Sequence, residues 1–573
     1  MSKKDKSKKE NGVPDAGPYR AGRAEAETSE NDGLVGDLVR QFADPYALFR
    51  ELAQNAIDAG SSEIHVRIVI TRADDAHEAR LSVTDDGCGM TQQVLEEDLV
   101  VLFRSTKEDR GDTIGKFGIG FVSVLALAPS LVVVSTCVGD DVRHVLHLHP
   151  DRSYDLYREP GGTRGTTVTL HVPLKDDGAE LVARSQAALE RWCGHASVPI
   201  HFNVVPASEA TPSVQQRIDR PIDLDQALVS VRAVSYDDET SALVGLVPET
   251  ARLAAFYNRG LLLHASRDRG TRASIAFKVS DPRLSHTLSR EDVRMDDAHA
   301  RALRLVEHAI SVPLTQEVLS EIGQAARAHV AGDATAGSRW IGIVDAARRA
   351  ELAIDPRRID VPLLAPVGGA RVLPCLGGSG PSRMARERDA LVDVLAAAGV
   401  PVIDASLARD AAEKETLESL LAAFTGTRPV HPRYLGSALV PLDAGRTSEA
   451  DAHLLAQLTR LLGVVLRAPS SVHLVDVVGA DTRLTFTLAH VDRAHLASAR
   501  DDEADPFRIA LRPPLGIAAG HPVVMAARAH PDPVVAADVL ARAVLADREL
   551  VTEARSLALA DASLRSLFGG GAR

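Results

Sequence analysis

The stretch "ELAQNAIDAG", Glu51 to Gly60, places two carboxylates and an amide on one side of a predicted helix. At 100° per residue, Glu51, Asn55 and Asp58 fall within about 60° of one another, and the apolar residues take the opposite side. One face is therefore suited to packing and the other to polar chemistry. A surface helix whose polar residues only meet water has the same pattern, so this helix alone leaves both interpretations open. The apolar residues are Leu48, Phe49, Leu52, Ala53 and Ala56.

A glycine-rich stretch, "RGDTIGKFGIG", precedes a predicted apolar helix and offers backbone groups to an anion. It is not a Walker A loop, because the glycine spacing is one residue too short and Phe117 stands where Ser or Thr is needed. Gly115, Gly118 and Gly120 lack side chains, so backbone N–H groups and the N-terminus of the next helix can face the anion. A flexible turn is the alternative interpretation.

Two further stretches end or begin predicted strands with residues that a ligand can approach. In "VTDDGCGMT", Asp85 ends a strand and can accept a hydrogen bond from an adenine amino group, while Gly87 and Gly89 leave the backbone accessible. In "RGTTVTLHV", Gly165 and Thr166 lead into a strand. The alternatives are an Asp-Gly turn for the first stretch and a threonine-rich edge strand for the second.

The order and spacing of these motifs favour one common site. A helix with E-x-x-x-N-x-x-D, a strand ending in D-x-G-x-G, G-x-x-G-x-G before a helix and G-T entering a strand follow one another over about 120 residues. This series resembles the superfamily of gyrase, heat-shock chaperone, histidine kinase and MutL ATPases, called GHKL. The resemblance implies that the polar face of the first helix lines a nucleotide pocket.

Carried over residue by residue, the resemblance assigns a role to each polar side chain. Glu51 would be the base that activates the attacking water, and Asn55 would be the side-chain ligand of Mg²⁺. Asp58 would line the pocket, Asp85 would hold the adenine, and Thr166 would support Asp85 through water. A positioned carboxylate base typically contributes about 10² to 10⁴ in rate.

The same resemblance implies where the phosphates of ATP and a mobile lid lie. Gly118, Ile119, Gly120 and Phe121 would offer backbone groups to the phosphates. The segment 91–117 would be the lid, and its polar, glycine-containing tip suits a moving loop. The other residues expected to bind nucleotide are Gly89, Met90, Ser105, Thr106, Lys107 and Gly115.

Within the superfamily, "ELAQNAIDA", "DDGCGMT" and "IGKFGIGFVS" are most similar to the ninety-kilodalton heat-shock chaperones, including bacterial HtpG. The Arg-Gly-Glu-Ala motif of MutL is absent after the second glycine box. In "SHTLSREDV", Arg290 resembles the arginine that these chaperones send to the γ-phosphate, and "FYNRGLLL" resembles a strand upstream of it. A solvated loop arginine is the alternative for Arg290. The C-terminal tail resembles the shortened C-terminal region of some bacterial members.

Composition limits the classes of partner. A formal net charge of −13 and an aromatic content of 4% do not favour a general nucleic-acid binder. The four cysteines are far apart and form no C-x-x-C pair, so neither a zinc site nor a disulfide framework is predicted. The basic first ten residues precede polar sequence, and no run of about 18 apolar residues occurs. We therefore expect a cytoplasmic protein without a membrane span.

The length of 573 residues predicts several domains. We expect an α+β protein, with an N-terminal GHKL (Bergerat-type) α/β sandwich followed by α/β middle domains and a small C-terminal α+β domain. The expected parts are a disordered basic tail (1–30), the ATP-binding domain (31–206), a first middle part with the arginine loop (218–335), a second middle part (340–445) and a C-terminal domain that mediates dimerisation (446–573).

Three local expectations concern the rest of the chain. The small, polar stretch Ala207 to Arg217 is predicted to be a linker. "DVPLLAPV", the helical "PSRMARERDALVDVLAAAG" and "VPVIDAS" suggest a βαβ unit. The last helical stretch offers apolar surface for self-association, unless it packs against its own preceding strands. Its apolar residues are Val534, Val535, Val539, Leu540 and Leu545.

The resemblance implies an ATP-driven, homodimeric molecular chaperone that acts on unfolded or partly folded client proteins. Glu51 and Arg290 would be its catalytic residues, with ATP and Mg²⁺ as cofactors. Membranes and nucleic acid are not expected as partners. The competing hypothesis is a GHKL ATPase of the MutL or topoisomerase type that acts on nucleic acid. A regulatory nucleotide-binding protein with little ATP hydrolysis is the third possibility.

Overall fold

A computed structural model describes most of the chain, whose contacts divide it into two compact units, Met1–Leu314 and Thr315–Arg573. The finer division into four folded parts stays a prediction. The described residues are 44–568 without 74–75, 100–119, 140, 152, 207–212, 269–271, 288–291, 375–382, 426–436, 467–468, 470, 480 and 498–512.

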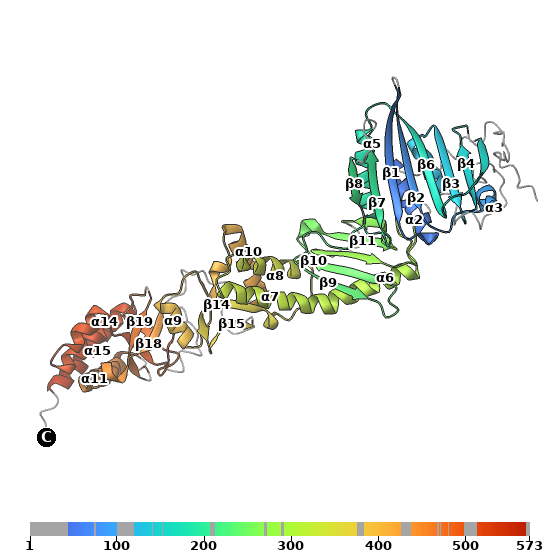
Figure 1. The fold of residues 1–573 in the computed structure, drawn as a ribbon. Coiled ribbons are helices and arrows are strands. Elements are labelled where there is room, and N and C mark those ends of the chain that lie inside the picture. Colours follow the sequence, from blue (N-terminus) through green and yellow to red (C-terminus); the bar gives the residue numbers. More distant parts are fainter. Residues whose placement is uncertain are drawn as a thin grey trace, which may run out of the picture. The chain divides into compact units, whose positions relative to one another are not determined.

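The first unit contains an eight-stranded sheet with the order β5-β4-β3-β6-β2-β1-β7-β8 (Figure 1). Neighbouring strands are antiparallel except β1 and β7, which run parallel. The strands are β1 Ile64–Ala73, β2 Ala76–Asp85, β3 Leu131–Cys137, β4 Val142–Leu148, β5 Tyr154–Pro160, β6 Gly165–Leu174, β7 Ile200–Val205 and β8 Val214–Arg217.

Alternating side chains give this sheet a packed face. In β1, Ile64, Val66 and Ile68 are at most 1% exposed and share one core with helices α2 and α5, while the residues between them are exposed. Helix α2 also contacts α5 and the short helix η3. The combination of sheet and helices confirms the α+β expectation. The helical elements are η1 Pro45–Ala47, α2 Leu48–Asp58, α3 Gln92–Val94, η2 Leu95–Leu99, η3 Phe121–Leu127 and α5 Ala179–Cys193.

A second, five-stranded sheet in the first unit has the order β12-β11-β13-β10-β9. Helix α6 packs on β9, β10 and β13. The elements are β9 Val229–Val234, β10 Ser241–Leu246, η4 Glu249–Ala251, β11 Leu253–Asn258, β12 Leu261–Ser266, β13 Ile275–Ser280, α6 Asp297–Ala309 and η5 Ile310–Leu314.

Two predictions for the first unit are wrong. The end of the predicted linker is strand β8, which pairs with β7 at the sheet edge, where polar residues are tolerated on the exposed side. The predicted single strand in "FYNRGLLL" is a hairpin. Its turn consists of Arg259 (φ 45°) and Gly260 (φ 79°), and two consecutive residues with positive φ are typical of a tight turn between strands.

The second unit begins with two helices and a four-stranded sheet with the order β15-β14-β17-β16. The predicted βαβ unit is only partly right, because β14 runs antiparallel to β17 and the parallel pair is β16 and β17. The connecting helix α9 starts late, since Asp389 accepts a hydrogen bond from the Val392 N–H (2.9 Å) and caps it. The elements are α7 Thr315–Val330, α8 Ala336–Arg349, η6 Pro356–Arg358, β14 Asp360–Val367, β15 Ala370–Pro374, β16 Arg383–Ala385, α9 Ala390–Ala397, β17 Val402–Asp404, η7 Ala405–Leu407 and α10 Ala411–Thr425.

The last part of the chain combines a five-stranded sheet, with the order β20-β22-β19-β18-β21, and a helical layer. The C-terminal end of this part consists of two helices, α14 and α15. The elements are β18 Ala438–Pro441, η9 Ala444–Arg446, α11 Glu449–Val465, β19 Val472–Val478, β20 Thr485–Thr487, β21 His495–Leu496, β22 Leu515–Ala518, α13 Pro522–Arg528, α14 Pro533–Asp547 and α15 Glu553–Phe568.

Helix α14 packs against helix α11 and the strands of the same part of the chain. Leu540 and Leu545 are 1% and 2% exposed and belong to the core that α14 forms with α11 and the neighbouring strands. Their predicted availability for self-association is therefore wrong, whereas Val539 is 49% exposed. Consecutive residues of a helix point about 100° apart, so one of the two neighbours is buried and the other is not. Within the described part of the chain, no helix has the length and apolarity that a membrane crossing requires.

We expect Leu540→Ala to lower the free energy of unfolding by about 2 to 5 kcal/mol, because it leaves a cavity in a packed core. The matched change Val539→Ala should cost less than about 1 kcal/mol, since about half of that residue is already in water. Urea denaturation of both full-length variants measures the difference. Equal losses would contradict the described packing of α14.

Candidate functional site

Helix α2 presents the two faces expected from its sequence. Leu48 and Phe49, on the packing side, are 0% and 1% exposed. On the other side, Asn55 and Asp58 are exposed and Glu51 is buried, at 8% exposure. A buried carboxylate on an otherwise solvent-facing side is costly unless a partner compensates its charge.

Arg50 supplies that compensation. Its Nη2 atom lies 3.2 Å from Oε1 of Glu51, and the two side chains are 4% and 10% exposed. The guanidinium also stacks over the Trp192 ring of α5, with Cζ 4.7 Å from the ring centroid. Burial lowers the pKa of Arg50 to about 10, which leaves it charged at neutral pH. Arg50 was not predicted as a site residue, although its position beside Glu51 is visible in the sequence.

Asp85 lies at the carboxyl end of β2, directly opposite Thr166 of β6. Its Oδ1 atom accepts a hydrogen bond from the Gly87 N–H at 2.8 Å. Burial raises the pKa of Asp85, and hydrogen bonds from the backbone of Gly87 and Thr166 oppose that rise. The carboxylate is thus oriented by the following turn.

Thr136 of β3 connects two of the motif segments, and sequence reasoning missed it. Its hydroxyl accepts a hydrogen bond from the Met90 N–H (2.8 Å) and lies 3.3 Å from the Gly165 carbonyl and 3.1 Å from the Thr166 hydroxyl. Thr136 is 1% exposed. The predicted support of Asp85 by Thr166 through water remains a prediction, but the register of β2, β6 and β3 brings Asp85, Thr166 and Thr136 into one row.

Glycines let the backbone segments of the site approach one another. Gly89 has φ +70°, and a Cβ atom there would overlap the Cys137 carbonyl. Gly165 has φ +126°, and a Cβ atom there would overlap the Asp85 carbonyl. Both positions therefore require glycine for packing alone, independently of any bound ligand.

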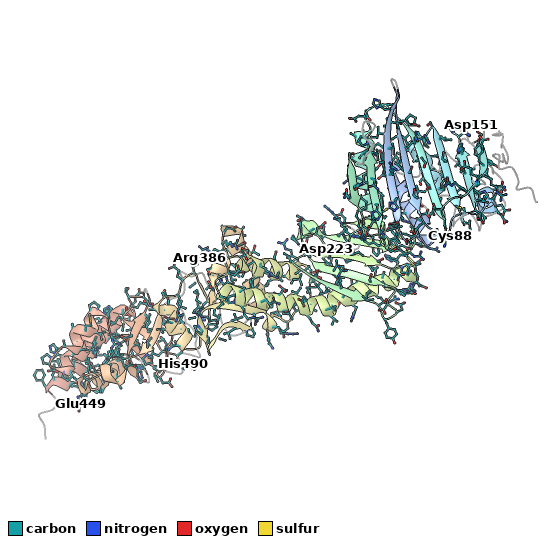
Figure 2. All side chains as sticks on the ribbon, in the orientation of Figure 1. Cys88, Asp151, Asp223, Arg386, Glu449 and His490 are labelled. Atoms are coloured by element: carbon teal, nitrogen blue, oxygen red, sulfur yellow. The ribbon has the colours of Figure 1, made fainter. Side chains whose placement is uncertain are left out.

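The turn after Asp85 is fastened to the end of α2. The Cys88 N–H donates to the Ala59 carbonyl at 3.0 Å, and Cys88, labelled in Figure 2, is exposed. Arg164 Nε donates to the Gly87 carbonyl at 3.1 Å from the loop before β6. The structure therefore brings together the first, second and fourth motifs.

Asp58 has partners of its own at the end of α2. Gln54 Nε2 donates to one carboxylate oxygen at 3.0 Å, and Arg259 Nη1 donates to the other at 2.9 Å. Arg259 belongs to the β11–β12 hairpin, and its backbone carbonyl accepts a hydrogen bond from the Ser197 N–H (3.0 Å). Asp58 therefore also connects α2 with the second sheet of the first unit.

The glycine-rich motif is described only at its end. Gly120 precedes η3, its carbonyl accepts a hydrogen bond from the Ser123 N–H at 3.1 Å, and Phe121 is 3% exposed. Six predicted nucleotide-binding residues lie outside the described residues: Ser105, Thr106, Lys107, Gly115, Gly118 and Ile119.

Arg290 also lies outside the described residues, but the segment before it is described. His286, four residues earlier, forms an isolated antiparallel β-bridge with Val293. Burial lowers the pKa of His286 to about 3, and the positive charge of Arg50 contributes to that lowering. His286, at the start of this segment, is therefore within electrostatic range of Arg50 of α2.

No group of three or more His, Cys, Asp or Glu side chains among the described residues is arranged to hold a metal ion. The exposed amide of Asn55 is one oxygen donor on the polar face of α2. One amide oxygen fits the way Mg²⁺ binds at nucleotide sites, where phosphate oxygens and water supply the remaining ligands. The described residues are consistent with a nucleotide-dependent Mg²⁺ site and not with a preformed cage.

Residues 43–176 match the family model described as "Histidine kinase-, DNA gyrase B-, and HSP90-like ATPase". This part of the chain is a GHKL ATPase domain, which confirms the interpretation of the four motifs.

Curated proteins similar to this chain include an Endoplasmin homolog and several proteins named chaperone protein HtpG. An Endoplasmin homolog from Dictyostelium discoideum is 29% identical over 213 residues, which is 34% of this chain and 27% of that protein. The chaperone protein HtpG from Gluconobacter oxydans is 28% identical over 30% of this chain and 32% of its own length. HtpG from Azorhizobium caulinodans is 30% identical over 30% and 31%. The matches span less than a third of each relative, and they confirm the predicted resemblance to HtpG.

We expect Thr136→Val to lower the free energy of unfolding by about 1 to 3 kcal/mol, because the Met90 N–H loses its acceptor in a part-buried position. Thr136→Ser keeps the hydroxyl and should retain most of the stability. Urea denaturation of the full chain, with hydrogen exchange at the Met90 amide, measures both effects. A serine variant as unstable as the valine variant would show that the methyl group matters and the hydroxyl does not.

Proposed function

We propose that the protein is an ATP-dependent molecular chaperone that uses ATP binding and hydrolysis to drive lid and domain closure on unfolded or partly folded client proteins. The observation that carries the proposal is the attachment of the Asp85 turn to the end of α2, the helix that bears Glu51 and Asn55. The similarity to proteins named HtpG supports the chaperone assignment. A cytoplasmic location is part of the same proposal.

In this proposal, each motif residue has a binding role. Asp85 accepts a hydrogen bond from the adenine amino group, and Asn55 binds the Mg²⁺ that neutralises phosphate charge. Backbone groups of Gly118 to Phe121 hold the phosphates, and Gly89 and Met90 border the base. The lid, 91–117, contributes Ser105, Thr106, Lys107 and Gly115.

Glu51 is the proposed general base. It accepts a proton from water as the water oxygen attacks the γ-phosphorus and the bond to the bridging oxygen breaks, which yields ADP and phosphate. Arg50 holds the carboxylate in one orientation before the water arrives. Arg290 stabilises the transferring phosphoryl group, a role that the position of His286 near Arg50 supports.

We expect Glu51→Ala to keep ATP binding and to reduce turnover by about 10² or more, because the base acts on water and not on the nucleotide. Asp85→Asn should weaken binding instead, since an amide presents a different hydrogen-bonding pattern to adenine. Calorimetric titration with ATP and a phosphate-release assay separate the two effects. Unchanged turnover in Glu51→Ala would overturn the mechanism.

Nucleotide affinity should also depend on pH through Asp85. An ionised carboxylate is an acceptor at both oxygens, so it can accept from the Gly87 N–H and from adenine together, whereas protonation turns one oxygen into a donor. Affinity is therefore full above the pKa and is lost as the pH falls through it. Because burial raises that pKa, the loss should begin at a higher pH than for an ordinary aspartate. The Asp85→Asn variant serves as the control, because it should not show this loss.

We further propose that the protein is a homodimer joined through α15. Leu557, Leu564 and Phe568 are 64%, 54% and 77% exposed, and their spacing of seven and four residues puts them on one face of the helix. A two-fold pair would bury the same face on both chains.

Light scattering at micromolar concentration should give a dimer for the full chain and a monomer for Leu564→Glu, because a carboxylate on this face cannot be buried without a partner. Asp561→Ala, which removes a carboxylate from the same face of α15, should remain dimeric. A full chain that is already monomeric would refute the dimer.

A further inference from the structure

A small cavity of about 200 Å³ lies in the second unit, apart from every residue assigned above. It is formed between the β16–β17 edge of the four-stranded sheet and helix α10, and Figure 2 labels Arg386 on its wall. The lining residues are Met384, Arg386, Ala405, Lys414, Leu417 and Glu418.

The cavity lies where an α/β fold commonly binds small ligands. Strands β16 and β17 are parallel, and helix α9 connects them. Arg386 directly follows the last residue of β16, and Ala405 directly follows the last residue of β17. The cavity is therefore at the carboxyl ends of both parallel strands, where the crevice of an open α/β sheet receives its ligands.

The inner wall of the cavity is apolar. Met384, Ala405 and Leu417 are 2%, 7% and 1% exposed, so they form a buried floor and not an exposed patch. A volume of about 200 Å³ is below the roughly 300 to 1,000 Å³ that is usual for drug-sized ligands. The space suits a short aliphatic or aromatic group.

Most of the described charged side chains around the cavity interact with one another, and one cation remains available to a ligand. Lys414 and Glu418 are one turn apart on α10, 3.9 Å from each other, and balance one another. Asp404, at the end of β17, accepts hydrogen bonds from His329 and Ser406. Arg386 has no ion-pair partner among the described residues, whereas the nearby Arg388 is paired with Asp393 at 2.6 Å.

We propose that this cavity binds a small organic carboxylate, with its apolar body on Met384, Ala405 and Leu417 and its carboxylate on Arg386. A guanidinium recognises a carboxylate with two parallel hydrogen bonds, and this supplies the specificity that an apolar wall lacks. The site is independent of ATP hydrolysis, so it stands or falls separately from the proposed function.

Calorimetric titration of the full chain with octanoate tests the proposal. Octanoate should bind at a single site, and octanamide, which has the same apolar body without the charge, should bind at least about 10-fold more weakly. Acetate, which has the charge without the apolar body, should show no measurable binding.

Two variants locate the site. Arg386→Ala should weaken octanoate binding about 10-fold, and Ala405→Leu, which fills the cavity, should abolish it. Arg388→Ala is the matched control and should bind as the unaltered chain does. Thermal denaturation confirms that each variant is folded. Octanoate that does not bind, octanamide that binds equally well, or an Arg386→Ala variant with unchanged affinity would each overturn the proposal.

Discussion

The close contact between Gly87 and Ala59 joins the end of β2 to the end of α2, and the candidate site depends on it. A Cβ atom on Gly87 would lie 2.7 Å from the Ala59 Cβ, so any larger side chain would separate the strand end from the helix. The Cys88 to Ala59 hydrogen bond reinforces the contact. Packing therefore keeps Asp85, which reads the base in the proposed function, and the helix carrying Glu51 in one rigid piece.

Local features of the sequence predicted the parts of this site that one element determines. The 3.6-residue period separated the buried and polar faces of α2 correctly, since a helix repeats its direction regularly. Asp44 caps the first turn by accepting the Tyr46 N–H at 2.9 Å, and Gly60, which follows the helix, has φ +74°, a conformation that suits glycine. Asp85 ends its strand where the Asp-Gly turn begins.

Contacts between segments that are far apart in the sequence could not be predicted from local sequence patterns. Thr136 meets Met90 across 46 positions, and Arg259 meets Asp58 across 201, and no periodicity in a single sequence encodes such pairings. Strand β8 was not predicted for a related reason. Its polar sequence does not indicate a strand, and its pairing with β7 holds it in that conformation. In α14, Val and Ala occur on every side, so the pattern did not reveal that Leu540 is buried and Val539 is exposed.

The Arg50–Glu51 and Arg259–Asp58 ion pairs, both among the described residues, differ in exposure, and this difference gives them different roles. The Arg50–Glu51 side chains are 4% and 10% exposed, so removing Glu51 would take the ion-pair partner from the buried Arg50 charge, at a cost of about 3 to 5 kcal/mol. The Arg259–Asp58 side chains are 44% and 46% exposed, a setting in which ion pairs contribute only about 0 to 1 kcal/mol. The strong pair holds the proposed base in place. The weak pair joins α2 to the second sheet by a contact that can break and re-form at little cost, as the closure in the proposed function would require.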